Sequence, residues 1–526
     1  MKHPLRFLLL PILTLPADAI EIRTYNATVH DRFIGFNTSS PAMNPNFLFD
    51  ATKFTGVGWF ATAGHKQPAL ISPRHFVWAT HHLPVLSQNV KFLDANGVVV
   101  QRTVTAFTAI ASDSSGDSDL SIATLNAAVP TTVTPFRYLN LANDPDYIPT
   151  NLMVFGFNPS GTGPRAGKGT LAGFAIADVD GGGPQGNTKL YHFDYNEVSG
   201  LADDSYLIVG DSGSPSFATV SGEPVLVGEH CTTNDTGSTI ESYDAFIPNY
   251  ATKLNTQMAP LGYRMRPANY TATTLSFTSA TTPAVLSQAY PGSVTFTFEN
   301  TGSQLTGNAE MTLAFAAAEA PASITATGWV VESTGSGSWS IRKATMAAGE
   351  EIAVTATWTA MPNVATMTVN ATIQSDTATT TLNQPAFTLK PTYASWASGL
   401  PQTGQGDDPD ADGLSNLLEY AFGGNGQSGV MLLSSGDSIR PQIFHQAGTI
   451  TLTYPERSDA VVRGLSYQVE TSTNLTALAG ATTLPAGAVS STQPYVPDVP
   501  GFVKRSISWP SDSAVRFARV KVELSE

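Results

Sequence analysis

Cysteine is almost absent from this sequence, because Cys231 is the only one in 526 residues. A single cysteine excludes an intramolecular disulfide, and with it the small disulfide-stapled folds of many secreted domains. Charged side chains are also scarce, at 13% of residues, and the formal net charge is -15. A negative surface repels phosphate backbones and anionic lipids, so we expect neither nucleic acid nor a membrane surface as a partner.

Long apolar runs are missing as well. After residue 19, no segment approaches the roughly 18 consecutive apolar residues that a membrane-spanning helix needs. Residues 1–19 differ, since Lys2 and Arg6 precede an apolar run that ends in Ala17-Asp18-Ala19, the small-x-small pattern that signal peptidase cleaves. We therefore predict a signal peptide over residues 1–19 and a secreted protein.

The sequence does contain many turn residues, with 44 Gly and 35 Pro, between short runs in which apolar and polar residues alternate. Val294, Phe296 and Phe298 alternate with threonine in this way, which is typical of half-buried strands. Since one core rarely serves 526 residues, we predict an all-β chain of several domains. Their predicted bounds are 20–264, a β-sandwich over 265–390, a linker with an acidic loop over 391–425, and a β-rich module over 426–526.

A serine motif lies at residues 210–215, Gly-Asp-Ser-Gly-Ser-Pro. A nucleophilic serine needs a tight turn that exposes its hydroxyl beside free backbone N–H groups, and glycines permit such a turn. Ser212 is therefore the candidate nucleophile. The N–H groups of Gly210 and Ser212 are the candidate oxyanion hole, which would stabilise negative charge on a substrate carbonyl oxygen.

A general base and a carboxylate are found upstream of this serine. His81 follows the apolar run 76–79 and is the candidate base, with His75, His82 and His192 as competitors. Asp119 stands at the head of the apolar run 120–123. A carboxylate there is suited to hold the imidazole in one tautomer.

These three motifs resemble those of the chymotrypsin-like serine protease family. Residues 79–82, Ala-Thr-His-His, are similar to the family's Ala-Ala-His-Cys, residues 119–122 to Asp-Ile-Ala-Leu, and residues 210–215 to Gly-Asp-Ser-Gly-Gly-Pro. The resemblance implies a double β-barrel over 20–264. It also implies a triad of His81, Asp119 and Ser212 that cuts protein or peptide substrates through an acyl-enzyme without a cofactor. His82, where the family has a half-cystine, and Ser214, where glycine is commoner, depart from the pattern.

Two other functions were weighed against this one. Lipases and esterases also use Ser, His and Asp, but their nucleophile motif is G-x-S-x-G and their chain order is Ser, Asp, His. Neither feature is present here. Ser214 stands two residues after Ser212 where the motif needs glycine, and the chain order is His81, Asp119, Ser212. A catalytically inert, protease-like adhesin is the alternative that stays open, since the β-rich domains after residue 264 would suit a surface protein.

Substrate preference is less clear from the residues. Tyr206 stands six residues before Ser212, where trypsin-like enzymes carry an acid, which disfavours a basic substrate residue. His230 lies in a segment that resembles glutamyl endopeptidases, in which a histidine binds an acidic substrate side chain, whereas Leu207 favours an apolar pocket. All three preferences stay open. We also expect Ile20, once exposed by cleavage after Ala19, to pair its amine with Asp211.

An acidic loop follows at residues 408–419. Asp408, Asp410, Asp412 and Glu419, with Gly413, match the pattern D-x-D-x-D-G-x5-E, in which one loop wraps a calcium ion. The carbonyl of Leu414 would add a further ligand. The loop resembles the calcium loops of dockerins and thrombospondin type 3 repeats, so we predict a structural Ca²⁺. The domains after residue 264 are expected to bind a cell-surface or extracellular component.

Overall fold

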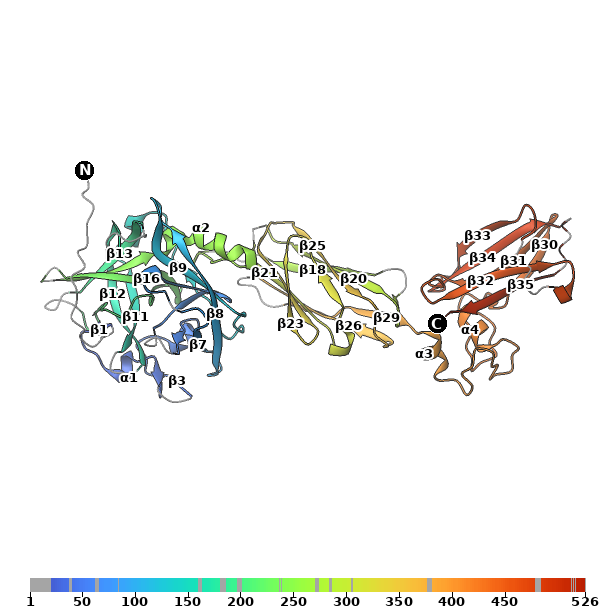
Figure 1. Ribbon diagram of the computed structural model, residues 1–526, viewed down its shortest axis with the longest axis horizontal. Coiled ribbons are helices and arrows are strands. Elements are labelled where there is room, and N and C mark those ends of the chain that lie inside the picture. The colour runs from blue at the N-terminus through green and yellow to red at the C-terminus, as the bar shows by residue number, and fades with distance from the viewer. Residues whose placement is uncertain are drawn as a thin grey trace.

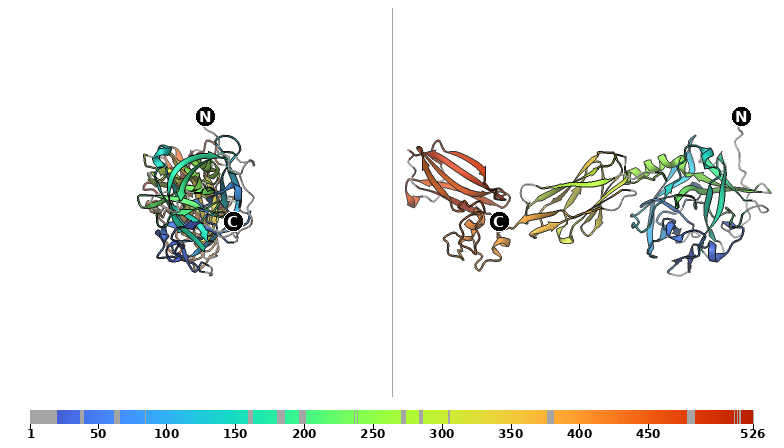
Figure 2. Two further views of the ribbon diagram at one scale, coloured as in Figure 1. Left: turned by 90° about the vertical axis from the view of Figure 1, so that its left-hand side faces the viewer. Right: turned by 180° about the vertical axis from the view of Figure 1, so that it is seen from behind.

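A computed structural model describes residues 20–525 apart from 37–39, 62–65, 84, 159–162, 180–185, 196–200, 236, 238, 270–273, 283–285, 304–305, 376–380, 478–483, 512, 514 and 516. The predicted signal peptide, residues 1–19, lies outside the described residues. The fold is all-β, and three units follow one another in a row from the N-terminal end of the molecule to the C-terminal sheet (Figure 1). The view from behind shows the same linear order, and in the view from the end the units overlap (Figure 2).

The first unit contains two barrels. In the first barrel six strands are ordered β4-β7-β8-β9-β6-β5, and a bridge between Val57 and Ala69 brings the segment before β4 back to β5. These strands are β4 (Trp59–Phe60), β5 (Ala69–Ser72), β6 (His75–Ala79), β7 (Asn89–Leu93), β8 (Val99–Ala111) and β9 (Asp117–Leu125).

The second barrel closes through the pairing of β16 with β17, in the order β16-β15-β11-β12-β13-β17, with β10 added to β16. Its strands are β10 (Arg137–Tyr138), β11 (Asn151–Asn158), β12 (Gly163–Ala177), β13 (Thr188–Tyr195), β15 (Pro215–Val220), β16 (Glu223–Asp235) and β17 (Ile240–Phe246). The remaining elements of this unit are β1 (Glu21–Ile22), α1 (Ala27–His30), β2 (Phe33–Ile34), β3 (Ala42–Met43), β14 (Ser205–Tyr206) and α2 (Ile247–Met258).

One apolar core joins the two barrels. Ile122 of the first barrel and Phe155 and Phe217 of the second belong to the same buried cluster, and α2 packs Tyr250 and Leu254 into it. Removing apolar surface from water stabilises the folded state by about 25 cal/mol per Å². The seam between the barrels is therefore a packed interior, which holds side chains from both barrels in fixed positions.

The middle unit is a β-sandwich with its own core. One sheet has the order β18-β20-β25-β22, the other β23-β24-β21-β27-β28, and a third has β19-β29-β26. Val294, Phe296 and Phe298 of β20 point into the core, as their alternation predicts. The strands are β18 (Leu275–Thr281), β19 (Leu286–Ser287), β20 (Gly292–Asn300), β21 (Thr306–Ala314), β22 (Ser323–Thr325), β23 (Val330–Gly335), β24 (Ser338–Met346), β25 (Glu351–Trp358), β26 (Thr366–Thr368), β27 (Asn370–Gln374), β28 (Thr381–Asn383) and β29 (Ala386–Lys390).

The last unit begins earlier than the sequence predicts. Residues 391–425 were expected to form a linker, but helices α3 (Tyr393–Ala397) and α4 (Asn416–Phe422) pack Tyr393, Tyr420 and Phe422 into the same core as the final strands. The apolar residues after the acidic loop indicate a short helix, but a local pattern does not show which core such a helix joins, which explains the difference. The strands are β30 (Gln442–Gln446), β31 (Thr449–Arg457), β32 (Leu465–Ser472), β33 (Val489–Pro494), β34 (Phe502–Pro510) and β35 (Phe517–Leu524).

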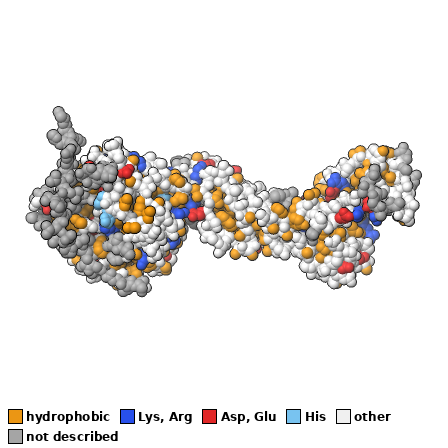
Figure 3. Space-filling view, viewed as in Figure 1, with side chains coloured by type: hydrophobic (Ala, Val, Ile, Leu, Met, Phe, Trp, Pro, Cys, Tyr) orange, Lys and Arg blue, Asp and Glu red, His pale blue; other side chains and the backbone are white. Residues whose placement is uncertain are grey.

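The surface agrees with the low charge content. On the face shown in Figure 3 the middle unit presents mainly uncharged side chains. Within the described residues, no helix is long and apolar enough to cross a membrane.

Candidate active site

Two neighbouring strands of the first barrel bring the histidine and the aspartate together. β6 and β9 are antiparallel partners, with Ala79 opposite Leu120. His81 lies in a 3-10 turn, Thr80–His82, that directly follows β6, and Asp119 precedes Leu120 in β9. Both side chains therefore emerge at the same edge of the barrel.

The three predicted triad residues form one hydrogen-bonded chain. His81 Nδ1 lies 2.8 Å from Asp119 Oδ2 and 2.9 Å from Oδ1, and His81 Nε2 lies 2.8 Å from Ser212 Oγ. An ionised carboxylate only accepts hydrogen bonds, so Nδ1 donates to Asp119, and Nε2 is left to accept from the serine hydroxyl. Asp119 is fully buried, whereas 27% of the His81 side chain is exposed, so the base is accessible from solvent.

Asp119 is held by further groups that the sequence did not single out. The His81 backbone N–H donates to Asp119 Oδ1 at 2.8 Å, and the Asp119 N–H donates to Thr188 Oγ1 at 2.8 Å. The Cys231 thiol lies beside Asp119 and donates to the Glu229 carbonyl oxygen at 3.5 Å. Burial, and next the charge of Asp119, raises the pKa of this thiol well above its usual range, so it stays a neutral donor. Thr188 and Cys231 come from β13 and β16, and no local motif marks either residue.

Ser212 projects from a turn that two glycines make possible. Gly210 has φ of 118° and Gly213 has φ of 89°, both in the region that favours glycine. A Cβ at Gly213 would lie 2.6 Å from the Trp78 ring, so the turn also packs directly on β6. Within the described part of the chain, the N–H groups of Gly210 and Ser212 have no acceptor, as a predicted oxyanion hole requires.

Asp211 lies behind this turn and is buried. The Ile208 and Phe157 N–H groups donate to its carboxylate at 3.0 and 3.3 Å, and the Ile20 backbone N–H donates to it as well. Burial raises the pKa of Asp211, and the hydrogen bond from Ile208 opposes that rise. The side chain of Ile20 is itself fully buried. The expected pair of Ile20 and Asp211 is thus adjacent, at the base of the nucleophile turn.

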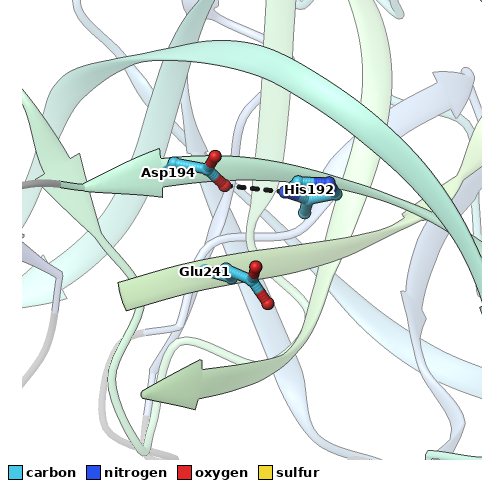
Figure 4. A group of neighbouring side chains, drawn as sticks. All are labelled: His192, Asp194 and Glu241. Carbon is cyan, nitrogen blue, oxygen red and sulfur yellow. Dashed lines mark hydrogen bonds and ion pairs between the residues drawn. The ribbon is translucent and has the colours of Figure 1, made fainter. Parts of the chain in front are cut away.

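Of the competing histidines, His82 follows His81 in the same turn, where its carbonyl oxygen accepts from Trp78 Nε1 at 2.6 Å, and the other two lie elsewhere. His192 Nδ1 is 2.7 Å from Asp194 Oδ1, with Glu241 close by on β17, and this group forms a separate surface cluster (Figure 4). His75 is buried and its Nδ1 lies 2.7 Å from Ser72 Oγ. Among the histidines that the structure describes, only His81 contacts both a buried carboxylate and Ser212.

His230 does not line a substrate pocket, and this corrects the hypothesis, one of the three preferences left open, that it binds an acidic substrate side chain. The residue is 1% exposed, with Nδ1 2.7 Å from Asp244 Oδ1 and Nε2 2.6 Å from the Phe155 carbonyl oxygen. Burial acts to lower the pKa of His230, but Asp244 and then Asp211 raise it above its usual value. Because both ring nitrogens are engaged inside the barrel, none is left to donate to a substrate.

The two other predicted pocket residues have different surroundings. Leu207 is buried in the core of the second barrel, and its N–H donates to Ser242 Oγ at 3.0 Å. Tyr206 is partly exposed and its ring lies 4.8 Å from that of Tyr195, with the two planes at 52°. No acid occupies position 206, so the argument against a basic preference stands as a prediction.

The acidic loop brings three of its predicted ligands together. Carboxylate oxygens of Asp408, Asp410 and Asp412 lie within 4.8 Å of one another. Glu419 is fully buried, and neither of its carboxylate oxygens has a hydrogen-bond partner in the described residues. Burial, and next the charges of the three aspartates, raises the pKa of Glu419 to about 7. The Leu414 N–H donates to Asp412 Oδ1 at 2.7 Å. This oxygen-rich, unsatisfied group fits calcium.

No family model and no curated protein matches this chain. Among solved structures, the secreted serine protease VesC from Vibrio cholerae is similar over 90% of this chain and 98% of its own, at 11% identity and a TM-score of 0.29. The VesB protease of Vibrio cholerae is similar over 65% and 97%, at 13% identity and 0.29. Human heparin binding protein is similar over 41% and 96%, at 14% identity and 0.26. Scores of this size carry no argument about activity.

Proposed function

We propose that this chain is a secreted serine endopeptidase. The observation that carries the proposal is the continuous hydrogen-bonded chain from buried Asp119 through His81 to Ser212. In this mechanism Ser212 Oγ attacks the carbonyl carbon of the substrate while its proton passes to His81 Nε2. Asp119 keeps the imidazole oriented and stabilises its positive charge. The oxyanion that forms accepts hydrogen bonds from the N–H groups of Gly210 and Ser212.

The same groups then form the acyl-enzyme, as the C–N bond of the tetrahedral intermediate breaks, and hydrolyse it. The proton on His81 passes to the leaving amine, the amine departs, and a water molecule gives its proton to His81 as it attacks the ester carbonyl. The C–O bond to Ser212 breaks and the hydroxyl regains its proton. Every step uses side chains and backbone groups of the chain itself, acting on a protein or peptide substrate.

Ser212→Ala and an active-site label test the proposal together. A fluorophosphonate should label the native chain at Ser212, and casein digestion should fall by about 10⁴-fold to 10⁶-fold in Ser212→Ala. Ser214→Ala is the matched control, since Ser214 is buried and donates its N–H to Asp211 O, outside the triad. It should keep most activity. Absence of both labelling and digestion in the native chain would instead favour the inert, adhesin-like alternative.

We also propose that the protein is exported from the cell. Residues 1–19 have the composition of a signal peptide, and N-terminal sequencing of the protein recovered outside the producing cell should begin at Ile20. We also propose that the units after residue 264 attach the protein to a cell-surface component. The β-rich, modular form of these units supports this.

A further inference from the structure

The middle and last units are joined by a buried polar cluster, which we call the clamp and define as Ser287, Pro391, Tyr420, Asp459 and Arg463. Ser287 Oγ in β19 donates to Asp459 Oδ2 at 2.9 Å, and Arg463 Nη2 donates to Ser287 Oγ at 3.1 Å. Arg463 also bonds to Asp459 and to the Pro391 carbonyl oxygen. The Tyr420 hydroxyl donates to the same carbonyl at 3.1 Å. The clamp thus binds a middle-unit strand directly to the last unit.

The clamp is buried, so its stability depends on complete hydrogen bonding of its charged groups. Arg463 is fully buried, and Asp459 and Ser287 are 6% and 4% exposed. A buried ion pair is favourable only when its hydrogen bonds are complete, and removing one partner leaves an uncompensated charge. A small movement of Tyr420 away from Arg463 and Pro391 would therefore weaken the whole junction.

Helix α4 connects the clamp to the acidic loop. Tyr420 of the clamp directly follows Glu419 of the loop in this seven-residue helix. Arg457 donates to the Tyr420 carbonyl at 3.0 Å, and the rings of Tyr393 and Trp396 lie 5.4 and 5.6 Å from the Tyr420 ring. Glu419 and Tyr420 are consecutive residues of one short helix, so a shift of Glu419 displaces Tyr420 with it.

Glu419 needs a cation to stay where it is. It is fully buried, both its carboxylate oxygens lack a partner in the described residues, and one buried oxygen each of Asp410 and Asp412 is unsatisfied in the same way. Buried carboxylates without partners are strongly unfavourable. A divalent ion with oxygen ligands would satisfy all of them at once, and this spacing of ligands along one loop suits calcium.

We propose that a calcium ion held by Asp408, Asp410, Asp412 and Glu419 orders helix α4, and that this ordered helix completes the clamp between the middle and last units. Calcium binding and the junction are then thermodynamically linked, because the ion binds the clamped arrangement better than the open one. The proposal goes beyond the protease activity and does not depend on it.

Hydrogen exchange of the full chain, with calcium and after chelation, tests the linkage. We expect amides of α4 and of β19 to exchange at least tenfold faster without calcium, while amides of β6 and β9 in the first unit stay unchanged. Magnesium at the same concentration should not restore protection, because it demands a smaller octahedral site. Unchanged exchange at both α4 and β19 would overturn the proposal.

Variants separate the ion site from the clamp. Glu419→Gln and the milder Asp408→Asn should abolish calcium binding in calorimetry and the calcium response in exchange. Asp407→Asn is the matched control, because Asp407 caps the Gly404 N–H at 2.8 Å and is not in the ligand group, and it should bind calcium normally. Ser287→Ala should bind calcium and protect α4 but no longer protect β19. If β19 still responds to calcium in Ser287→Ala, the clamp is not the route.

Discussion

His230 has a structural role inside the second barrel and does not contact substrate. Its imidazole is enclosed between Asp244 and the Phe155 carbonyl, and Asp244 also accepts from Tyr191 at 2.7 Å. Removing the imidazole leaves the Asp244 charge without its main partner in a fully buried position.

We therefore predict that His230→Ala destabilises the first unit by about 3–5 kcal/mol and leaves the substrate preference unchanged. Urea unfolding measures the first effect, and peptides that differ only at the residue before the cut measure the second. His445→Ala, on an exposed strand of the last unit, is the control and should alter neither. A changed preference in a stable His230→Ala protein would contradict the prediction.

His75 makes the first unit sensitive to acid. Burial, and next the neighbouring Arg74, lowers the pKa of His75 to about 4, whereas an unfolded histidine titrates near 6.5. The unfolded chain therefore takes up a proton first as pH falls, and stability present above pH 6.5 is lost progressively down to about pH 4.

The expected loss is about 3 kcal/mol between these two pH values, from a shift of roughly two and a half pKa units. His75→Gln, which keeps a group able to bond to Ser72, should flatten the dependence of the unfolding free energy on pH in this range. Denaturant titrations at pH 7, 5.5 and 4.5 measure it. The prediction fails if His75→Gln and the native chain lose stability equally.

At the scale of elements, the nucleophile turn depends on its contact with β6. Gly213→Ala would place a methyl group 2.6 Å from the Trp78 ring, so the turn must move and the oxyanion N–H groups move with it. We predict that kcat/KM falls by at least about 100-fold, the size of an oxyanion-hole loss.

Gly222→Ala is the matched control for that substitution. Its φ of 81° carries similar backbone strain, but only the flexible end of Lys53 lies within 4 Å of a Cβ there, at 3.9 Å. It should cost about 1 kcal/mol of stability and leave kcat/KM within twofold. Equal kcat/KM of the two variants would contradict a role for the packing of the turn on Trp78.

Strand β1 supplies the second prediction at this scale. Ile20 stands directly before β1 and bonds through its N–H to buried Asp211, so a free α-ammonium at Ile20 would place a positive charge against that carboxylate. A chain that begins at Ile20 should be active. A chain with Gly-Ser added before Ile20, and Asp211→Asn, should each lose at least about 100-fold in kcat/KM.

Active-site titration with a fluorophosphonate gives the fraction of competent sites in each of these preparations. Glu21→Gln, at an exposed neighbouring position, should titrate fully. An extended chain that titrates as completely as the one beginning at Ile20 would contradict this activation model.

The elements also show what the sequence can and cannot predict. Alternation found β20 because one face of the sheet is buried and the other is solvated, and the serine, histidine and aspartate motifs are each local in sequence. Thr188, Cys231 and the inward position of His230 were missed or misread, because their contacts come from strands distant along the chain. The packing of α4 into the core of the last unit was missed, because its contacts come from strands distant along the chain.

At the scale of the whole molecule, polar contacts hold the first junction. Arg74 Nη1 and Arg342 Nη2 donate to Glu332 at 3.1 and 2.6 Å, and Asn308 exchanges two hydrogen bonds with the backbone of Arg264 at 2.7 and 2.9 Å. These groups link the first unit to the sheet of the middle unit that contains β21 and β24. Hydrogen bonds and ion pairs therefore cross both junctions between the units, in addition to the connecting chain.

The row of three units has a hydrodynamic consequence. A rod-like particle experiences more friction than a sphere of equal mass, so this 55.4 kDa chain should sediment slowly and elute early from a sizing column, as if it were a larger globular protein. Light scattering on the same peak gives the mass of the eluting species, which separates an extended single chain from an oligomer. An elution volume that matches a compact sphere of 55.4 kDa would mean that the units fold back on one another in solution.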